Sequence, residues 1–107
     1  MGKTKQGVMK NATTIEKIMA LSPREFEKSI AAFAGAHVPV VDGRASIALG
    51  TEGQIAEIVF EPLPPRRVGG LLDLPQARVS IVMPNVASEL QSDFLRRFDI
   101  AFQRGGG

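Results

Sequence analysis

Two stretches of the chain place apolar residues at the spacing of an amphipathic helix. Over residues 23–34 the apolar positions recur every three or four residues, with Ser22 and Glu25 at capping-box spacing before them and Gly35 as a stop after them. Residues 88–104 carry a continuous apolar stripe, formed by Leu90, Phe94, Leu95, Phe98, Ala101 and Phe102. The sequence therefore predicts two main helices, over 23–34 and roughly over 88–104.

The middle of the chain changes to a period of two, which is typical of strands. Apolar and polar residues alternate over 44–49, over 55–61 and again over 78–83. The turn residues between 50 and 53 join the first two of these strands at hairpin distance. The pattern predicts an antiparallel sheet of at least three strands.

Two shorter elements follow from weaker patterns. The apolar residues of 14–21 have helical spacing, so a short helix is expected before the main one. Residues 38–41 are expected to form a fourth, short strand that turns at Asp42-Gly43. Pro39 would restrict that strand to an edge of the sheet, because proline has no N–H to donate.

The order of these elements predicts an α+β fold. We expect a two-layer sandwich in which a three- to four-stranded antiparallel sheet carries the two main helices on one face, in the order α-α-β-β-β-α. Residues 13–104 would form this single domain. Residues 1–12, polar and lysine-containing, are expected to be a disordered basic tail, and 105–107 a flexible C-terminus.

The composition of the chain excludes several kinds of functional site but says little about the fold. The chain has 107 residues and no cysteine, which excludes disulfides, thiolate metal sites and cysteine nucleophiles. No apolar run approaches the roughly 20 residues of a membrane span, so we expect no membrane association and a cytoplasmic protein. The formal net charge of +2 comes from the lysines of the first ten residues, so the predicted domain itself is close to neutral.

The segment between the second and third predicted strands, residues 61–75, is long for a connection in a small domain. Its adjacent arginines are followed closely by paired glycines, a combination that suits anion binding through guanidinium groups and open backbone amides. We therefore predict an anion-binding candidate at Arg66, Arg67, Gly69 and Gly70. The alternative is a rigid connector in which the prolines set direction and the arginines lie in water.

The uncovered face of the predicted sheet is the second candidate. Its outward apolar positions are Ile55, Val59 and Val82, with charged residues around them. An apolar centre with a charged rim suits a protein partner or a second copy of the chain. The alternative is that these side chains are the scattered apolar residues found on every protein surface.

Nothing in the sequence indicates catalysis. His37 is the only histidine, and no serine or carboxylate stands at a spacing that would pair it for acid–base work. The carboxylates are dispersed and match no metal-binding loop. We expect no enzyme, no catalytic residue, no metal and no cofactor.

The leading hypothesis is a non-enzymatic binding module, with self-association through the open sheet face as one form of it. The alternative is binding of anions or nucleic acid, RNA in particular, through residues 66–70 and the basic tail. A third hypothesis is an enzyme whose pocket is assembled only by the fold.

Overall fold

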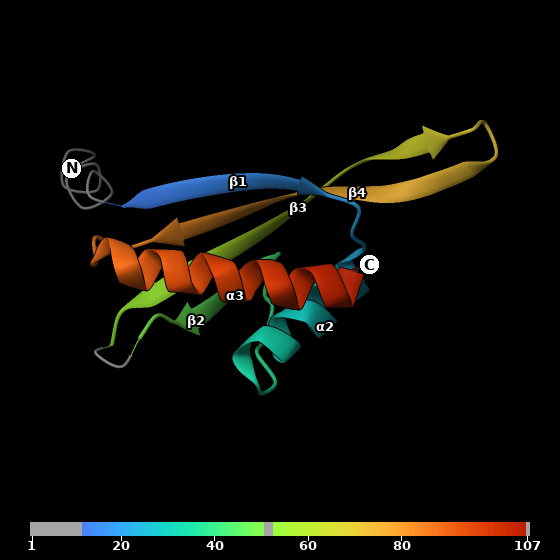
Figure 1. Cartoon of the computed structure of the whole chain (residues 1–107). Coiled ribbons are helices and arrows are strands. Elements are labelled where there is room, and N and C mark those ends of the chain that lie inside the picture. Colours follow the sequence, from blue (N-terminus) through green and yellow to red (C-terminus); the bar gives the residue numbers. More distant parts are fainter. Residues whose placement is uncertain (1–11, 51–52, 107) are drawn as a thin grey trace, which may run out of the picture.

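The computed structural model describes residues 12–50 and 53–106. Within them the sheet is antiparallel throughout and has the strand order β1-β4-β3-β2. The elements follow one another as β1 (Thr13–Met19), α2 (Pro23–Ala34), β2 (Arg44–Ala48), β3 (Ile55–Val68), β4 (Leu72–Met83) and α3 (Ser88–Gly106) (Figure 1). Most of the expected basic tail, residues 1–11, and residue 107 lie outside the described residues.

The predicted α+β fold with an antiparallel sheet and two main helices is confirmed, and the sheet has four strands. The first of the two helices has its predicted bounds. The Ser22 hydroxyl accepts a hydrogen bond from the Glu25 backbone N–H at 3.2 Å, and the Glu25 carboxylate accepts one from the Ser22 N–H at 2.9 Å. Gly35 ends the helix in the left-handed conformation, at φ 76°. Local capping chemistry therefore sets both ends of α2.

The predicted helix over 14–21 is wrong, because this segment is the edge strand β1, which changes the element order to β-α-β-β-β-α. Lys17 occupies a position on the helix-covered face of the sheet, and its Nζ lies 3.2 Å from Asp99 Oδ1 of α3. Ile18 points to the opposite face and is exposed. Because a lysine faces inward and an isoleucine faces outward, the apolar–polar alternation that indicates a strand is broken here. The β-branched residues Thr13, Thr14 and Ile15 at the start of the segment do favour a strand.

The predicted strand over 38–41 is also wrong. Only Val41 pairs, through two backbone hydrogen bonds of 3.0 and 2.9 Å with Arg44 around the turn Asp42-Gly43. Both turn residues have positive φ, 52° and 76°, as a two-residue hairpin turn of the mirror-image type requires. Val38 and Val40 instead pack against the core, so residues 36–40 form a loop beside α2.

The segment expected to be a connector, 61–75, forms two paired strands. β3 continues to Val68 and β4 begins at Leu72, with one irregularity in register between Leu63 and Arg66. β2 pairs with β3 only up to Val59, and β1 pairs with β4 only from Ala77 onward. The two-stranded part between these residues therefore projects beyond the sheet (Figure 1). We call residues 62–76 the arm.

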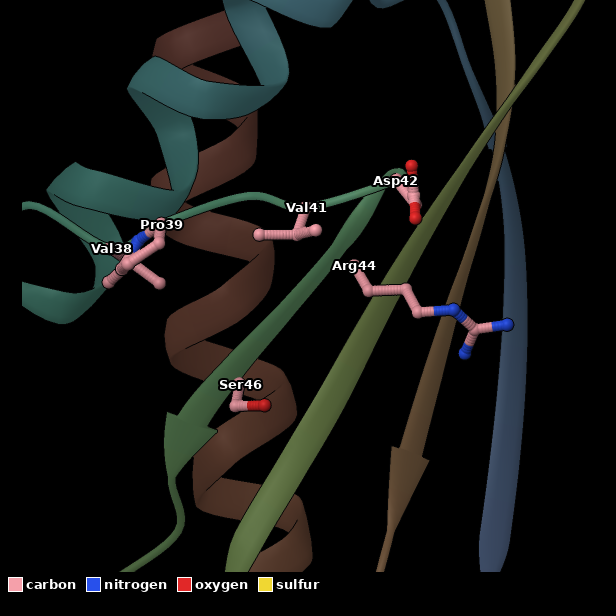
Figure 2. A pocket seen from close by; sticks show the side chains of 6 residues that line it. All are labelled: Val38, Pro39, Val41, Asp42, Arg44 and Ser46. Carbon is pink, nitrogen blue, oxygen red and sulfur yellow. The ribbon is translucent and has the colours of Figure 1, made fainter.

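A single core lies between the sheet and the helices. In Figure 2 α3 passes behind β2 and β3, and α2 lies beside α3. Inward side chains of the strands alternate with outward ones, and the helices contribute Phe26, Phe94, Phe98 and Phe102, each at most 1% exposed. Phe98 and Phe102 stack at 4.1 Å between ring centroids, and Phe26 lies 4.9 Å from Phe60 of β3. The phenylalanines thus pack the helices against the sheet, and no helix or strand among residues 12–50 and 53–106 covers its other face.

Candidate functional site

Exposed apolar side chains are concentrated at the end of the arm. Eight large apolar residues are exposed in the described part of the chain, and four of them lie between positions 68 and 74. Their exposed fractions are 42% for Val68, 94% for Leu71, 60% for Leu72 and 38% for Leu74. Apolar side chains gathered on a projecting element are typical of a surface that binds another macromolecule.

The register of the arm places these residues on one side of it. Val68 is opposite Leu72, and Arg66 is opposite Leu74. Side chains directly opposite in an antiparallel pair project from the same face, and residues two apart share a face. Arg66, Val68, Leu72 and Leu74 therefore form one side of the arm, which we call the apolar side, with Leu71 at its tip.

The opposite side of the arm is polar. Arg67 is opposite Asp73, and its Nε lies 3.3 Å from Asp73 Oδ1. Both side chains are more than half exposed, so this ion pair adds little to stability. Opposite charges directly across from each other do indicate that two strands pair. Arg67 and Asp73 on either side of Gly69-Gly70 are therefore the sequence signal that would have revealed a hairpin here.

The edges of the arm are poor in hydrogen-bond donors. Pro62, Pro64, Pro65 and Pro75 all lie in its strands, and two of them fall at the register irregularity. Proline is accepted in a sheet at edges and bulges, where its missing N–H removes no ladder bond. A donor-poor edge disfavours the addition of a further strand, so the arm is built to bind through side chains.

The predicted anion-binding residues are only partly brought together. Arg66 and Arg67 project from opposite sides of the arm, and Arg67 is engaged by Asp73. Gly69 and Gly70 form the turn at the tip, at φ 64° and 73°, where the Leu71 N–H donates to the Val68 carbonyl at 3.3 Å. The two guanidinium groups thus do not share a face. Anion binding by these residues stays a prediction.

The predicted interface residues do share a face. Ile55, Val59 and Val82 lie on the side of the sheet away from the helices, and Val82 is directly opposite Glu57. Val82 is therefore the diagonal neighbour of both Ile55 and Val59, which lie on either side of Glu57 along β3. The three residues thus share one face of the sheet, and their role as an interface stays a prediction.

Ion pairs cross the same open face. Arg78 contacts Glu61 at 3.0 Å and approaches Glu16 at 4.0 Å, which links β1, β4 and β3. Arg44, whose side chain extends over the sheet in Figure 2, lies 3.5 Å from Glu57. Side chains that are already ion-paired with one another therefore surround Ile55, Val59 and Val82, which we call the apolar trio. The apolar side of the arm is the less polar of the two surfaces.

Three pockets surround the loop over residues 35–43. One, of about 320 Å³, lies where the arm begins and is lined by residues of α2, of the Asp42-Gly43 turn and of β3. A second, of about 440 Å³, borders β2 (Figure 2), and a third, of about 480 Å³, is lined by Arg24, Lys28 and the exposed His37. We call the first the base pocket. Sequence patterns did not indicate it, because its walls come from three segments distant in the chain.

A charged cluster on α3 forms its hydrogen bonds within that helix. The Asp93 carboxylate accepts hydrogen bonds from Arg96 and from Arg97, one turn further along the helix. These guanidinium groups hold the pKa of Asp93 below its usual value of 3.8. The Arg97 guanidinium also lies 5.4 Å from the centre of the Phe33 ring. The cluster is therefore accounted for by contacts within the helix layer.

Within residues 12–50 and 53–106, no group of three or more histidine, cysteine or acidic side chains is placed to hold a metal ion. No helix in the same part of the chain is both long and apolar enough to cross a membrane. Comparison with protein-family models, with curated proteins and with solved structures yields no match.

Proposed function

We propose that this chain is a non-enzymatic interaction module that associates with a second copy of itself through the arm. The observation that carries the proposal is the gathering of four exposed apolar side chains at the end of the arm. Removing such side chains from water is the main favourable term in protein association, at about 25 cal/mol per Å² of apolar surface.

The arm is a better binding element than the centre of the open face. The apolar trio on that face is bordered by the Arg78–Glu61 and Arg44–Glu57 ion pairs, which would lose water on burial. The apolar side of the arm carries one charge, that of Arg66, and its prolines leave few backbone donors to satisfy. Docking there desolvates fewer polar groups.

Replacing both Leu71 and Leu72 by glutamate is expected to abolish self-association. The two residues are the most exposed of the apolar group, and their replacement puts charge at the contact. Sedimentation velocity over a concentration series up to the millimolar range measures the effect. The unaltered chain should pass from monomer to dimer, while the double variant should remain monomeric with an unchanged unfolding temperature.

The control is Ile100→Glu. Ile100 is 46% exposed on α3, so it changes the same kind of surface residue outside the arm. This variant should dimerise like the unaltered chain. A chain that stays monomeric at millimolar concentration would refute the proposal. If that monomer bound RNA with an affinity that fell steeply as salt increased, the nucleic-acid alternative would be favoured instead.

A further inference from the structure

The apolar side of the arm continues the open face of the sheet. Along β4 the buried positions alternate regularly with outward ones as far as Met83, and this alternation puts Leu72 and Leu74 on the same side as Arg78 and Val82. One surface therefore runs from the tip of the arm along the whole of β4. Five of the eight exposed large apolar side chains lie on it, namely Ile18, Ile55, Val68, Leu72 and Leu74.

This surface carries two unbalanced charges of opposite sign. Arg78 lies 3.0 Å from Glu61 and 4.0 Å from Glu16, so one positive and two negative groups leave this acidic cluster with a net charge of −1. Neither carboxylate pairs with another basic side chain of residues 12–50 and 53–106. Arg66, exposed on the apolar side of the arm, forms no ion pair within the same ranges. The surface thus holds a cation and an acidic cluster that complement each other.

The Arg66 side chain cannot balance the cluster of its own molecule. Arg66 is opposite Leu74 and Glu61 is opposite Arg78, so four residues of β4 separate the two positions. At about 3.3 Å per residue this separation is roughly 13 Å, which is more than an arginine side chain spans. A second copy of the chain can supply the guanidinium group instead.

A two-fold axis midway between the two charges brings them together. Leu63 and Gln76 are opposite each other and lie halfway between the levels of Arg66 and Glu61. If two copies stack with these surfaces facing and their strands antiparallel, an axis passing between the sheets at this level places Arg66 of each copy over Glu61 of the other. The two contacts are then equivalent, and the dimer is closed.

The same register brings apolar side chains together. Val68 lies two residues beyond Arg66, and Val59 lies two residues before Glu61. Val68 of each copy therefore falls over Val59 of the other, and Leu72, directly opposite Val68, extends this contact to the side. A single arrangement pairs the free charges and covers apolar residues of the arm and of the open face.

We propose that the arm of each copy lies on the part of the open face next to the arm of the other, with Arg66 contacting Glu61 of the second copy. This rests on the proposed self-association and adds the face that the arm binds and the residues that pair. Arg66 compensates the excess negative charge of the Arg78 cluster, which would otherwise oppose its burial. The cluster is balanced only in the dimer.

Exchanging charges between two variants tests the pairing. In Arg66→Glu the arm repels the acidic cluster of the second copy, and in Glu61→Arg the altered open face repels the basic arm. Each variant alone should dimerise with a dissociation constant raised at least about tenfold. Sedimentation velocity over a concentration series measures this, and the unfolding temperature of each variant checks that it folds.

An equimolar mixture of the two variants should restore the dimer. The acidic arm of the first variant then meets the basic position of the second, and the unaltered arm of the second meets the unaltered Glu61 of the first. Both contacts are attractive, so the mixture should form a heterodimer nearly as tight as the original dimer. Sedimentation velocity with one variant fluorescently labelled detects the heterodimer.

The matched control is Arg67→Glu. It makes the same change of charge one residue further along, but on the side of the arm that faces away from the proposed contact. It should neither weaken the dimer nor form a heterodimer with Glu61→Arg that is tighter than the Glu61→Arg homodimer. If Arg67→Glu weakens the dimer as much as Arg66→Glu does, the proposed pairing is wrong.

The outcome separates this pairing from the proposed function. If the unaltered chain dimerises through Leu71 and Leu72 but the mixture shows no recovery, the pairing of Arg66 with Glu61 is wrong while self-association through the arm stands. If the unaltered chain does not dimerise, both fail.

Discussion

Replacing Phe26 by alanine is expected to lower the free energy of unfolding by about 3–5 kcal/mol. The Phe26 side chain is 1% exposed, and its ring lies 4.9 Å from that of Phe60 and 6.0 Å from that of Phe102. It therefore joins α2 to the sheet and to α3 at one point. Truncation removes those contacts and leaves a cavity that rigid neighbours on three elements cannot fill.

Thermal and urea unfolding measure this loss, at protein concentrations low enough to keep the chain monomeric. For a domain of this size the transition temperature should fall by more than about 10 °C. The control is Ile100→Ala on the outer side of α3, which should change the stability by less than about 1 kcal/mol. Equal, small effects at both positions would show that the phenylalanine cluster does not hold the helices on the sheet.

The parts of the fold that sequence predicted are those whose signals are local. The bounds of α2 follow from Ser22, Glu25 and Gly35, each of which acts on backbone groups within four residues of itself. The hairpin of β2 and β3 follows from alternation on both sides of a short turn. No knowledge of distant residues is needed for either element, so a pattern along the chain was sufficient.

The errors arose where a distant partner decides the structure. Lys17 lies on the covered face at the edge of the sheet, where its side chain stays partly exposed and pairs with Asp99, eighty-two positions along the chain. Pattern alone assigned this segment to a helix, because its inward and outward residues break the expected alternation. The strand forms because β4 offers a complete ladder of partners from Ala77 to Met83.

The sequence predicted only part of the candidate site, for the same reason. The sequence singles out residues 61–75 as an anion-binding candidate or, alternatively, as a rigid connector, and not as paired strands, because prolines disfavour strands in the interior of a sheet. At a free edge the same prolines are compatible with pairing, and the pairing sorts Arg66 and Arg67 onto opposite sides. The base pocket forms where residues 26, 42 and 60 come together in the fold. No spacing pattern along the chain predicts this proximity.

The turn between the loop and β2 makes the second strong prediction: Gly43→Ala should lower the free energy of unfolding by about 2–4 kcal/mol. Gly43 has φ 76°, and a Cβ placed there would lie 2.5 Å from the Phe60 carbonyl oxygen. The Gly43 carbonyl also accepts a hydrogen bond from the Phe60 N–H at 2.6 Å. The clash is with backbone, so relieving it must move β3 or break that bond.

Gly35→Ala provides a control with the same backbone strain, because Gly35 also has φ 76° but nothing lies within 4 Å of its added Cβ. Left-handed strain alone should lower its stability by about 1 kcal/mol. The difference between the two variants, measured by urea unfolding, then isolates the close approach of the turn to β3. That approach holds Asp42 and Gly43 beside Phe60 in the base pocket. Equal stabilities for the two variants would mean that the turn is not held against β3.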